Sequence, residues 1–205
     1  MIYLIITTCI NTKYYIHNNE NRLHKYVDSI KKTLSFVPET ITPIIVENSS
    51  SGNSYFDTIG CKVHYTNNNS KECIHKGVNE LLDIKDVIET YKIQEEDVII
   101  KLTGRYHPIN SEFFDLILRT HHTFDAYVKF FNVCTLCFHD YDCVLGMYAI
   151  KCKYLNTFMY TDIHASPEVE FATFVRNHVN SEKLYSVQTL NLRCCFAGDL
   201  RILDV

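Results

Sequence analysis

The sequence predicts an α/β protein whose central sheet is mostly parallel. Short runs of β-branched and apolar residues, such as 1–6, 41–46 and 97–102, have the length of buried strands. Longer segments between them place apolar residues at helical spacing. Strands that alternate with helices in this way form a parallel sheet with helices on both faces.

The first half of the chain carries the regular part of this pattern. Pro38 closes the first helix, and Asn69 with Glu72 has the spacing of a capping box for the second. Pro108 lacks the N–H that a strand ladder needs, so we expect no pairing there. The expected strands are 1–6, 41–46, 61–65 and 97–102, and the expected helices are 22–37 and 69–82, which 86–91 extends or follows.

The second half of the chain is more mixed. Asn110 or Ser111 can cap the helix that leads into it. Ser166-Pro167-Glu168 predicts another helix start, because it combines an N-cap serine, a first-turn proline and an acid. The expected strands here are 126–133, 143–150 and 184–190.

The turn after the strand at 97–102 is the strongest candidate for a ligand site. In open α/β sheets ligands bind outside the carboxyl ends of the strands. The strand ends at Thr103-Gly104-Arg105-Tyr106, where Gly104 permits close backbone approach and Arg105 offers a planar fork for phosphate. The alternative is an ordinary strand-to-helix turn with an exposed arginine.

Composition excludes several classes of function. A formal net charge of -4 argues against a general nucleic-acid binder, which needs a basic face. Nine cysteines without a framework spacing indicate reduced thiols of a cytosolic protein. No stretch approaches the roughly 20 apolar residues of a membrane span, and residues 1–10 lack the features of a signal peptide. We therefore expect a cytoplasmic protein.

Several short motifs resemble those of GT-A glycosyltransferases. Residues 5–9, 44–48 and 76–79 (IITTC, IIVEN and KGVN) are similar to the nucleotide-sugar half of that fold. The runs IKLTGRY at 100–106, MYAIK at 147–151 and SPE at 166–168 resemble a group of capsule- or surface-glycan glycosyltransferase-like proteins with relatives in bacteria and large DNA viruses. If the protein is viral, its location is the host cytoplasm.

This resemblance implies a single GT-A-like, Rossmann-like αβα sandwich over 1–205 with a mostly parallel, mixed sheet. Residues 1–120 would bind a nucleoside-diphosphate sugar and 121–205 would face the acceptor, a glycan or protein. The implied activity is transfer of the sugar to an acceptor hydroxyl. The implied donor-binding residues are Thr8, Glu47, Lys76, Asn79, Lys101, Thr103, Gly104, Arg105 and Tyr106.

The sequence departs from the family at the metal motif. GT-A enzymes usually carry Asp-x-Asp where this strand offers Lys101 and Arg105, and such cations can neutralise a diphosphate directly. The sequence therefore leaves open whether the protein binds a divalent cation, Mn²⁺ or Mg²⁺. Asp140-Tyr141-Asp142 is a spare Asp-x-Asp that reads equally well as an exposed acidic turn.

Two further clusters leave alternatives open. Glu168 is the candidate general base for an acceptor hydroxyl, although Glu168 and Glu170 also suit the positive end of a helix dipole. Cys134, Cys137, His139 and Cys143 have a tolerable zinc spacing, but buried core thiols explain them as well. A non-catalytic nucleotide- or glycan-binding module of the same fold is the competing function.

Overall fold

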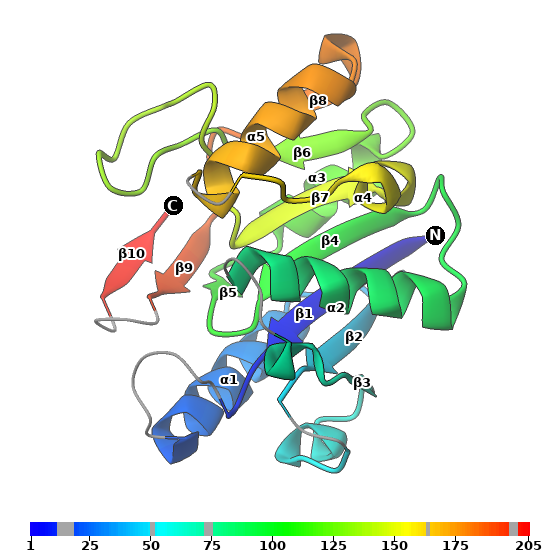
Figure 1. Ribbon diagram of the computed structural model, residues 1–205, viewed down its shortest axis with the longest axis vertical. Coiled ribbons are helices and arrows are strands. Elements are labelled where there is room, and N and C mark those ends of the chain that lie inside the picture. The colour runs from blue at the N-terminus through cyan, green and yellow to red at the C-terminus, as the bar shows by residue number, and fades with distance from the viewer. Residues whose placement is uncertain (12–18, 50–51, 72–75, 163–164, 197–200) are drawn as a thin grey trace.

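A seven-stranded mixed sheet forms the centre of the protein (Figure 1). The computed structural model describes residues 1–11, 19–49, 52–71, 76–162, 165–196 and 201–205. The strand order is β3-β2-β1-β4-β7-β6-β8, and within it β7 runs antiparallel to both of its neighbours while the other pairs are parallel. The strands are β1 (Ile2–Thr8), β2 (Ile41–Glu47), β3 (Lys62–Tyr65), β4 (Val98–Thr103), β6 (Ala126–Val128), β7 (Met147–Lys151) and β8 (Leu184–Ser186). The predicted α/β class with a mostly parallel, mixed sheet is confirmed.

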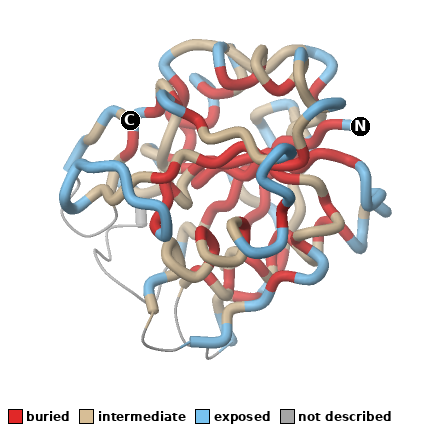
Figure 2. The backbone as a smooth tube through the Cα atoms, turned by 90° about the horizontal axis from the view of Figure 1, so that it is seen from above, coloured by how far each residue is buried: buried red, intermediate tan, exposed pale blue. Residues whose placement is uncertain are grey.

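Helices cover both faces of this sheet, which gives three layers. Side chains alternate between the two faces along a strand, so Leu4 and Ile6 pack with α1 and α3 while Tyr3 and Ile5 pack with α2, α4 and α5. Figure 2 shows the buried strands in the middle and the exposed backbone at the periphery. Full burial of one such side chain stabilises the fold by roughly 1.5–3 kcal/mol. The helices are α1 (Asn19–Leu34), α2 (Lys76–Tyr91), α3 (Glu112–Thr120), α4 (Cys152–Thr157) and α5 (Pro167–His178).

A second, three-stranded sheet contains β5 (His107–Pro108), β9 (Leu192–Cys195) and β10 (Ile202–Asp204) in the order β10-β9-β5. The expectation that Pro108 excludes pairing is wrong, because Pro108 lies opposite Leu192 in an antiparallel bridge. Proline is tolerated here since β5 is an edge strand. The strand expected over 184–190 is also too long, and the chain instead continues into the unpredicted β9.

At two of the three predicted helix starts, a predicted capping side chain accepts a hydrogen bond from a backbone N–H of the first turn. The Ser166 hydroxyl accepts from the Val169 N–H at the start of α5, as predicted. Asn110 Oδ1 accepts from the N–H of Glu112, the first residue of α3. Asn69 is not the N-cap of α2, because it lies in a 3-10 turn (η2, Asn68–Ser70) that ends in extended backbone at Lys71. Glu72, the other member of the expected capping box, lies outside the described residues.

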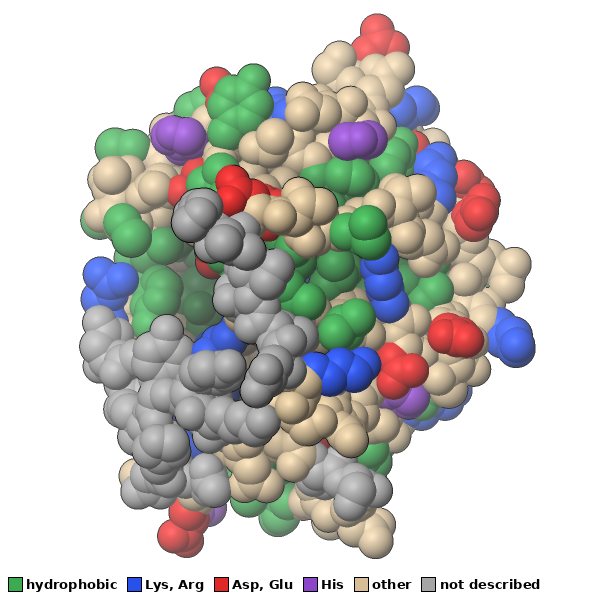
Figure 3. Space-filling model, viewed as in Figure 1, with side chains coloured by type: hydrophobic (Ala, Val, Ile, Leu, Met, Phe, Trp, Pro, Cys, Tyr) green, Lys and Arg blue, Asp and Glu red, His purple; other side chains and the backbone are tan. Residues whose placement is uncertain are grey.

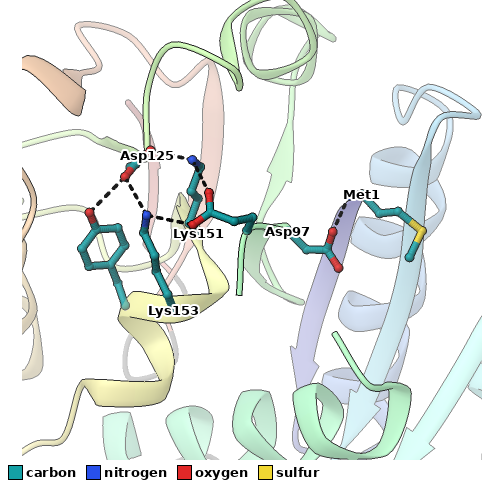
Figure 4. Close-up of polar contacts among 7 residues, drawn as sticks. Met1, Asp97, Asp125, Lys151 and Lys153 are labelled. Carbon is teal, nitrogen blue, oxygen red and sulfur yellow. Dashed lines mark hydrogen bonds and ion pairs between the residues drawn. The ribbon is translucent and has the colours of Figure 1, made fainter. Parts of the chain in front are cut away.

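Charged side chains at the amino end of β4 join it to β6 and β7 (Figure 4). The ammonium groups of Lys151 and Lys153 lie 2.8 and 3.2 Å from the Asp125 carboxylate, and both also contact Glu96. Burial alone would raise the pKa of Asp125, but the hydrogen bonds from these lysines and from Tyr154 outweigh it and lower the pKa. This network lies at one end of the strands, opposite the carboxyl ends of β1, β2 and β4.

Three further parts of the second half differ from expectation. The strands expected over 126–133 and 143–150 shorten to β6 and β7, and isolated bridges such as Phe130 to Cys143 join the segments between them. Helix α4, directly after β7, is not predicted. No helix in the described part of the chain has both the length and the apolar character needed to cross a bilayer.

Candidate active site

A polar cleft opens at the carboxyl ends of β1, β2 and β4, next to the start of α2. It holds about 480 Å³ of space that no atom fills, including solvent at its mouth. The lining residues are Thr7, Thr8, Cys9, Arg22, Tyr26, Asn48, Asn69, Lys76, Asn79, Glu80 and Arg105.

Positive charge dominates this cleft although the whole chain is acidic. Among the described residues, Arg22, Lys76 and Arg105 line it, against one carboxylate, Glu80. The N-terminus of α2 adds the positive end of a helix dipole, which also favours anions. Figure 3 shows basic and acidic side chains beside hydrophobic ones near the middle of one face. The site chemistry therefore suits an anionic ligand.

Arg105 is held at the cleft by two contacts. Its Nη1 donates to the Tyr26 hydroxyl at 3.1 Å, and its Nε lies 3.4 Å from the backbone oxygen of Cys195 in β9. The guanidinium carbon also lies 5.9 Å from the centroids of the Tyr26 and Tyr106 rings. The sequence thus places Arg105 correctly after β4, but β9 and α1 fix its direction.

Arg22, on the first turns of α1, approaches the same hydroxyl. Its Nη2 donates to Tyr26 at 3.0 Å and its Nε donates to the Cys9 carbonyl at 2.6 Å. Because both arginines contact one oxygen, the two bonded nitrogens lie no more than about 6 Å apart. Two like charges at that distance repel by on the order of 3 kcal/mol at an effective dielectric constant of 20.

Close packing around Gly104 leaves no room for a side chain. A Cβ there would lie 2.8 Å from Thr8 Cγ2 and 3.0 Å from the Thr7 oxygen and from the Tyr26 ring. The Gly104 N–H donates to the Thr7 oxygen at 2.9 Å. The predicted glycine site therefore holds the end of β4 against the end of β1 and α1, which brings Arg105 to the cleft.

Thr8 and Glu47 join the ends of β1 and β2. The buried Thr8 hydroxyl lies 2.7 Å from Glu47 Oε2, and the Glu47 carboxylate also accepts from the N–H groups of Ile10 and Ser49. Glu47 is fully buried, so these hydrogen bonds replace the water that its charge loses. Thr8 lines the cleft, whereas Glu47 lies behind it and shapes the loops.

Lys101 and Thr103 face the other side of the sheet from Tyr26. The Lys101 ammonium is buried and contacts Glu80 at 2.6 Å, Thr103 Oγ1 at 2.8 Å and the Leu145 oxygen at 2.9 Å. These contacts use all three of its donors. Lys101 therefore reaches the cleft only through Glu80, which lines it. The alternation of side chains along β4 explains this placement.

Lys76 and Asn79, both on α2, lie at the cleft as the resemblance implies. Burial, together with the charges of Arg105 and Arg22, lowers the pKa of Lys76 to about 8. The buried Oδ1 of Asn79 accepts no hydrogen bond from the described residues, and the same holds for Oδ1 of Asn48. An unmet buried acceptor costs about 1–3 kcal/mol, so each of these oxygens lowers the stability of the region beside the cleft.

The buried carboxylate of Asp83 holds residues beside the cleft in place. Asp83, on α2, accepts hydrogen bonds from Asn48, Thr66 and Asn68 at 2.7–2.8 Å. Burial raises its pKa to about 7, and these bonds only partly offset that effect. Asp83 thereby ties α2 to the ends of β2 and β3 and orients the Asn48 amide at the cleft.

The two remaining candidate residues, Tyr106 and Glu168, lie toward the second half of the chain. Tyr106 packs against Gly146, where an added Cβ would come within 2.3 Å of the ring. Burial raises the pKa of Tyr106, and among its neighbours the charge of Glu168 raises it further. Glu168 is half-buried, and its carboxylate makes no hydrogen bond or ion pair with the described residues. Glu168 is not among the residues that line the cleft, although its charge influences Tyr106, the residue that follows Arg105.

The two alternative metal clusters are not assembled. Asp140 pairs with Arg176 at 3.0 Å, while Asp142 accepts from Asn132 at 2.6 Å, so the two carboxylates have separate partners. Cys143 is buried and donates to the backbone oxygen of Glu168, whereas Cys134 and Cys137 are exposed. Among the residues that the structure describes, no three His, Cys, Asp or Glu side chains are grouped to hold a metal.

The described residues at the cleft do not form a ligand set for a resident divalent cation either. Glu47 is saturated by backbone and hydroxyl donors, Glu80 is paired with Lys101, and Asp83 accepts three hydrogen bonds. Mn²⁺ and Mg²⁺ require several oxygen ligands directed at one point. The basic side chains, rather than a carboxylate pair, face the space where a diphosphate would lie.

Sequence reasoning missed two important lining residues, Arg22 and Tyr26. Both lie on the predicted first helix at i and i+4, a spacing that places them on one face. Tyr26 falls among the apolar positions Leu23, Val27 and Ile30 and so reads as core. An arginine one turn before a core tyrosine was the available signal.

Comparison with known proteins establishes the fold. No protein-family model matches the chain, and no curated protein matches it. The CMP:2-keto-3-deoxy-manno-octonic acid synthetase complexed with CTP matches with a TM-score of 0.57 and 9% identity, over 91% of this chain and 89% of that chain. Protein A197 from STIV matches with a TM-score of 0.52 and 14% identity, over 99% and 93% of the two chains.

A glycosyltransferase is also among the structural matches. The mannosyltransferase PcManGT from Pyrobaculum calidifontis, in complex with GDP-Man and Mn²⁺, gives a TM-score of 0.55 at 8% identity. The match covers 99% of this chain and 56% of the mannosyltransferase. At such identities the likeness shows the fold alone: the Rossmann-like α/β fold of GT-A glycosyltransferases and nucleotidyltransferases, as predicted.

Proposed function

We propose that this protein is a glycosyltransferase that moves a sugar from a nucleoside-diphosphate sugar to a hydroxyl of a glycan or other acceptor. The observation that carries the proposal is the grouping of Arg22, Lys76 and Arg105 in a cleft at the carboxyl ends of β1, β2 and β4. In an open α/β sheet this is the place where ligands bind. Three cations there, in a chain of formal net charge -4, indicate a polyanionic ligand.

The chemistry assigned to the cleft is stabilisation of the leaving group. Transfer breaks the bond between the sugar and the diphosphate, and negative charge develops on the departing diphosphate. Arginine donors placed beforehand at that position stabilise the charge without any rearrangement. Arg105 and Arg22 take this role, with Lys76 beside them, and Lys101 acts indirectly by holding Glu80.

Glu168 is the proposed general base. It would accept the proton of the acceptor hydroxyl while that oxygen attacks the anomeric carbon of the sugar. Its carboxylate makes no hydrogen bond or ion pair with the described residues, and it lies near enough to Tyr106 to influence its pKa. Glu170 is a poorer choice, because its carboxylate accepts from the N–H groups of Thr161 and Asp162 at 2.8 Å.

Two other functions are compatible with the same cleft. A nucleotidyltransferase would join a nucleoside triphosphate to a sugar phosphate and release pyrophosphate, and the fold match to the CTP-bound synthetase favours including it. A binding module would hold the nucleotide without turnover. The division of labour between 1–120 and 121–205, the cytoplasmic location, and the link to capsule glycans and to viral relatives remain predictions.

Product analysis separates the three functions. The purified protein is incubated with a panel of nucleoside-diphosphate sugars, with and without acceptor sugars, and released nucleoside diphosphate is measured. Release of nucleoside diphosphate that requires Glu168 supports the glycosyltransferase. Release of pyrophosphate from a nucleoside triphosphate and a sugar phosphate would replace it with a nucleotidyltransferase, and binding without any product would leave the binding module.

A further inference from the structure

The buried hydroxyl of Tyr26 is the point where three donors of the cleft meet. The Cys9 N–H, Arg22 Nη2 and Arg105 Nη1 lie 3.2, 3.0 and 3.1 Å from its oxygen. A phenolic oxygen has two lone pairs, so it is fully used as an acceptor here. The Tyr26 side chain is 1% exposed and packs edge-on against Phe56 at 6.2 Å, which fixes the position of the oxygen.

The two arginines that it binds keep free donors. Arg22 reaches Tyr26 from one turn earlier on α1, and Arg105 reaches it from the turn after β4. Nη1 of Arg22 and Nη2 of Arg105 donate no hydrogen bond to the described residues, whereas both Nε groups are bonded to backbone oxygens. Each guanidinium is therefore anchored on one side and available on the other.

We propose that Tyr26 is a positioning residue that holds Arg22 and Arg105 as one clamp for the two phosphates of a diphosphate. This inference rests on the proposed function, because it assigns the phosphate contacts of the same cleft. Two guanidinium groups repel each other in the free protein, and a shared acceptor keeps them together. A pair fixed in advance loses less conformational freedom on binding than two independent side chains.

The clamp predicts a specific pattern of phosphate selectivity. Orthophosphate carries one phosphate group and engages one arginine at a time, whereas pyrophosphate engages both. Tyr26→Phe removes the oxygen and retains the ring packed against Phe56. We expect pyrophosphate, UDP and GDP to bind roughly 5–20-fold more weakly to this variant. Orthophosphate binding should change less than about 2-fold, because a single arginine suffices for it.

A matched control tests whether loss of any buried tyrosine hydroxyl has the same effect. Tyr127 is fully buried in β6, its hydroxyl lies 2.9 Å from Thr120, and it does not line the cleft. Tyr127→Phe should leave all four affinities unchanged. Arg22→Lys provides a second route that leaves Tyr26 intact, because lysine keeps the charge but cannot bond the Cys9 oxygen and Tyr26 as a fork.

Isothermal titration of the wild-type protein and the three variants gives a decisive result. Loss of pyrophosphate selectivity in both Tyr26→Phe and Arg22→Lys supports the clamp. Equal losses for orthophosphate and pyrophosphate, or no loss in Tyr26→Phe, overturn it while wild-type binding of UDP or GDP keeps the proposed function. A wild-type protein that binds no nucleoside diphosphate overturns both.

Discussion

Replacement of Arg105 by alanine tests the assignment of the cleft most directly. The substitution removes a guanidinium that lines the cleft and has donors available for a phosphate. A hydrogen bond between charged partners contributes about 1.5–3 kcal/mol. We therefore expect the dissociation constant for a nucleoside diphosphate to rise roughly 10- to 150-fold.

The same substitution should leave the fold intact. Within the protein Arg105 makes a 3.1 Å bond to Tyr26 and a long, 3.4 Å contact to the Cys195 oxygen. Together these contribute roughly 1–2 kcal/mol, and part of that is regained because Arg105 no longer repels Arg22. A typical domain is stable by about 5–15 kcal/mol, so the variant should unfold cooperatively at only slightly lower denaturant.

Calorimetric titration with UDP and GDP measures the first effect, and urea unfolding measures the second. Arg176→Ala is the matched control, because Arg176 also bonds a neighbour, Asp140, through two nitrogens but lies on α5 outside the cleft. An Arg105→Ala protein with wild-type nucleotide affinity would remove Arg105 from the site. Equal losses in both variants would mean that the effect is not specific to the cleft.

Three further changes have defined outcomes. Glu168→Gln should lower turnover roughly 10²- to 10⁴-fold at unchanged donor affinity, and persistent turnover would reject it as the base. Gly104→Ala should cost about 1–3 kcal/mol in urea unfolding, because its Cβ meets Thr8 at 2.8 Å; unchanged stability would contradict the close packing. Burial raises the pKa of Asp83 to about 7, above its value in the unfolded chain. The folded state then holds an extra proton between about pH 4 and 7, so the free energy of unfolding should fall as pH rises through that window. Asp83→Asn should flatten this dependence, and a slope equal to wild type would refute the assignment.

The sequence predicts best those parts of the fold that local patterns determine. Strands β1, β2 and β4 are short apolar runs between polar segments, so burial on both faces of a parallel sheet is visible in each run by itself. Strands β9 and β10 are not visible in this way, because Leu192–Cys195 acquires its partners from β5, over 80 residues earlier, and from β10. Helix α4 is only 6 residues long, too short for periodicity to reveal.

The residues of the candidate site also differ in how well local sequence predicts them. Arg105 follows from local chemistry, since a cation and a glycine after a buried strand indicate a ligand turn. Lys101 shows the limit of that reasoning: it lies four residues earlier, but the two-residue period of β4 directs it to α2 and Glu80. The contribution of Arg22 depends on how α1 packs against β1 and β4, which no local pattern specifies.

The electrostatics of the cleft distinguish a binding site from a structural ion network. At the opposite end of the strands, Lys151 and Lys153 form ion pairs with Asp125 and Glu96, so positive and negative charges neutralise one another within the protein. Among the described residues of the cleft, Arg22 and Arg105 share the hydroxyl of Tyr26, and the lining carboxylate, Glu80, is already paired with Lys101. Burial lowers the pKa of Lys76, and the positive charges of Arg105 and Arg22 lower it further. A fold that retains repelling cations at the mouth of its sheet gains stability when an anion binds between them, and by linkage that gain is the binding energy available to the ligand.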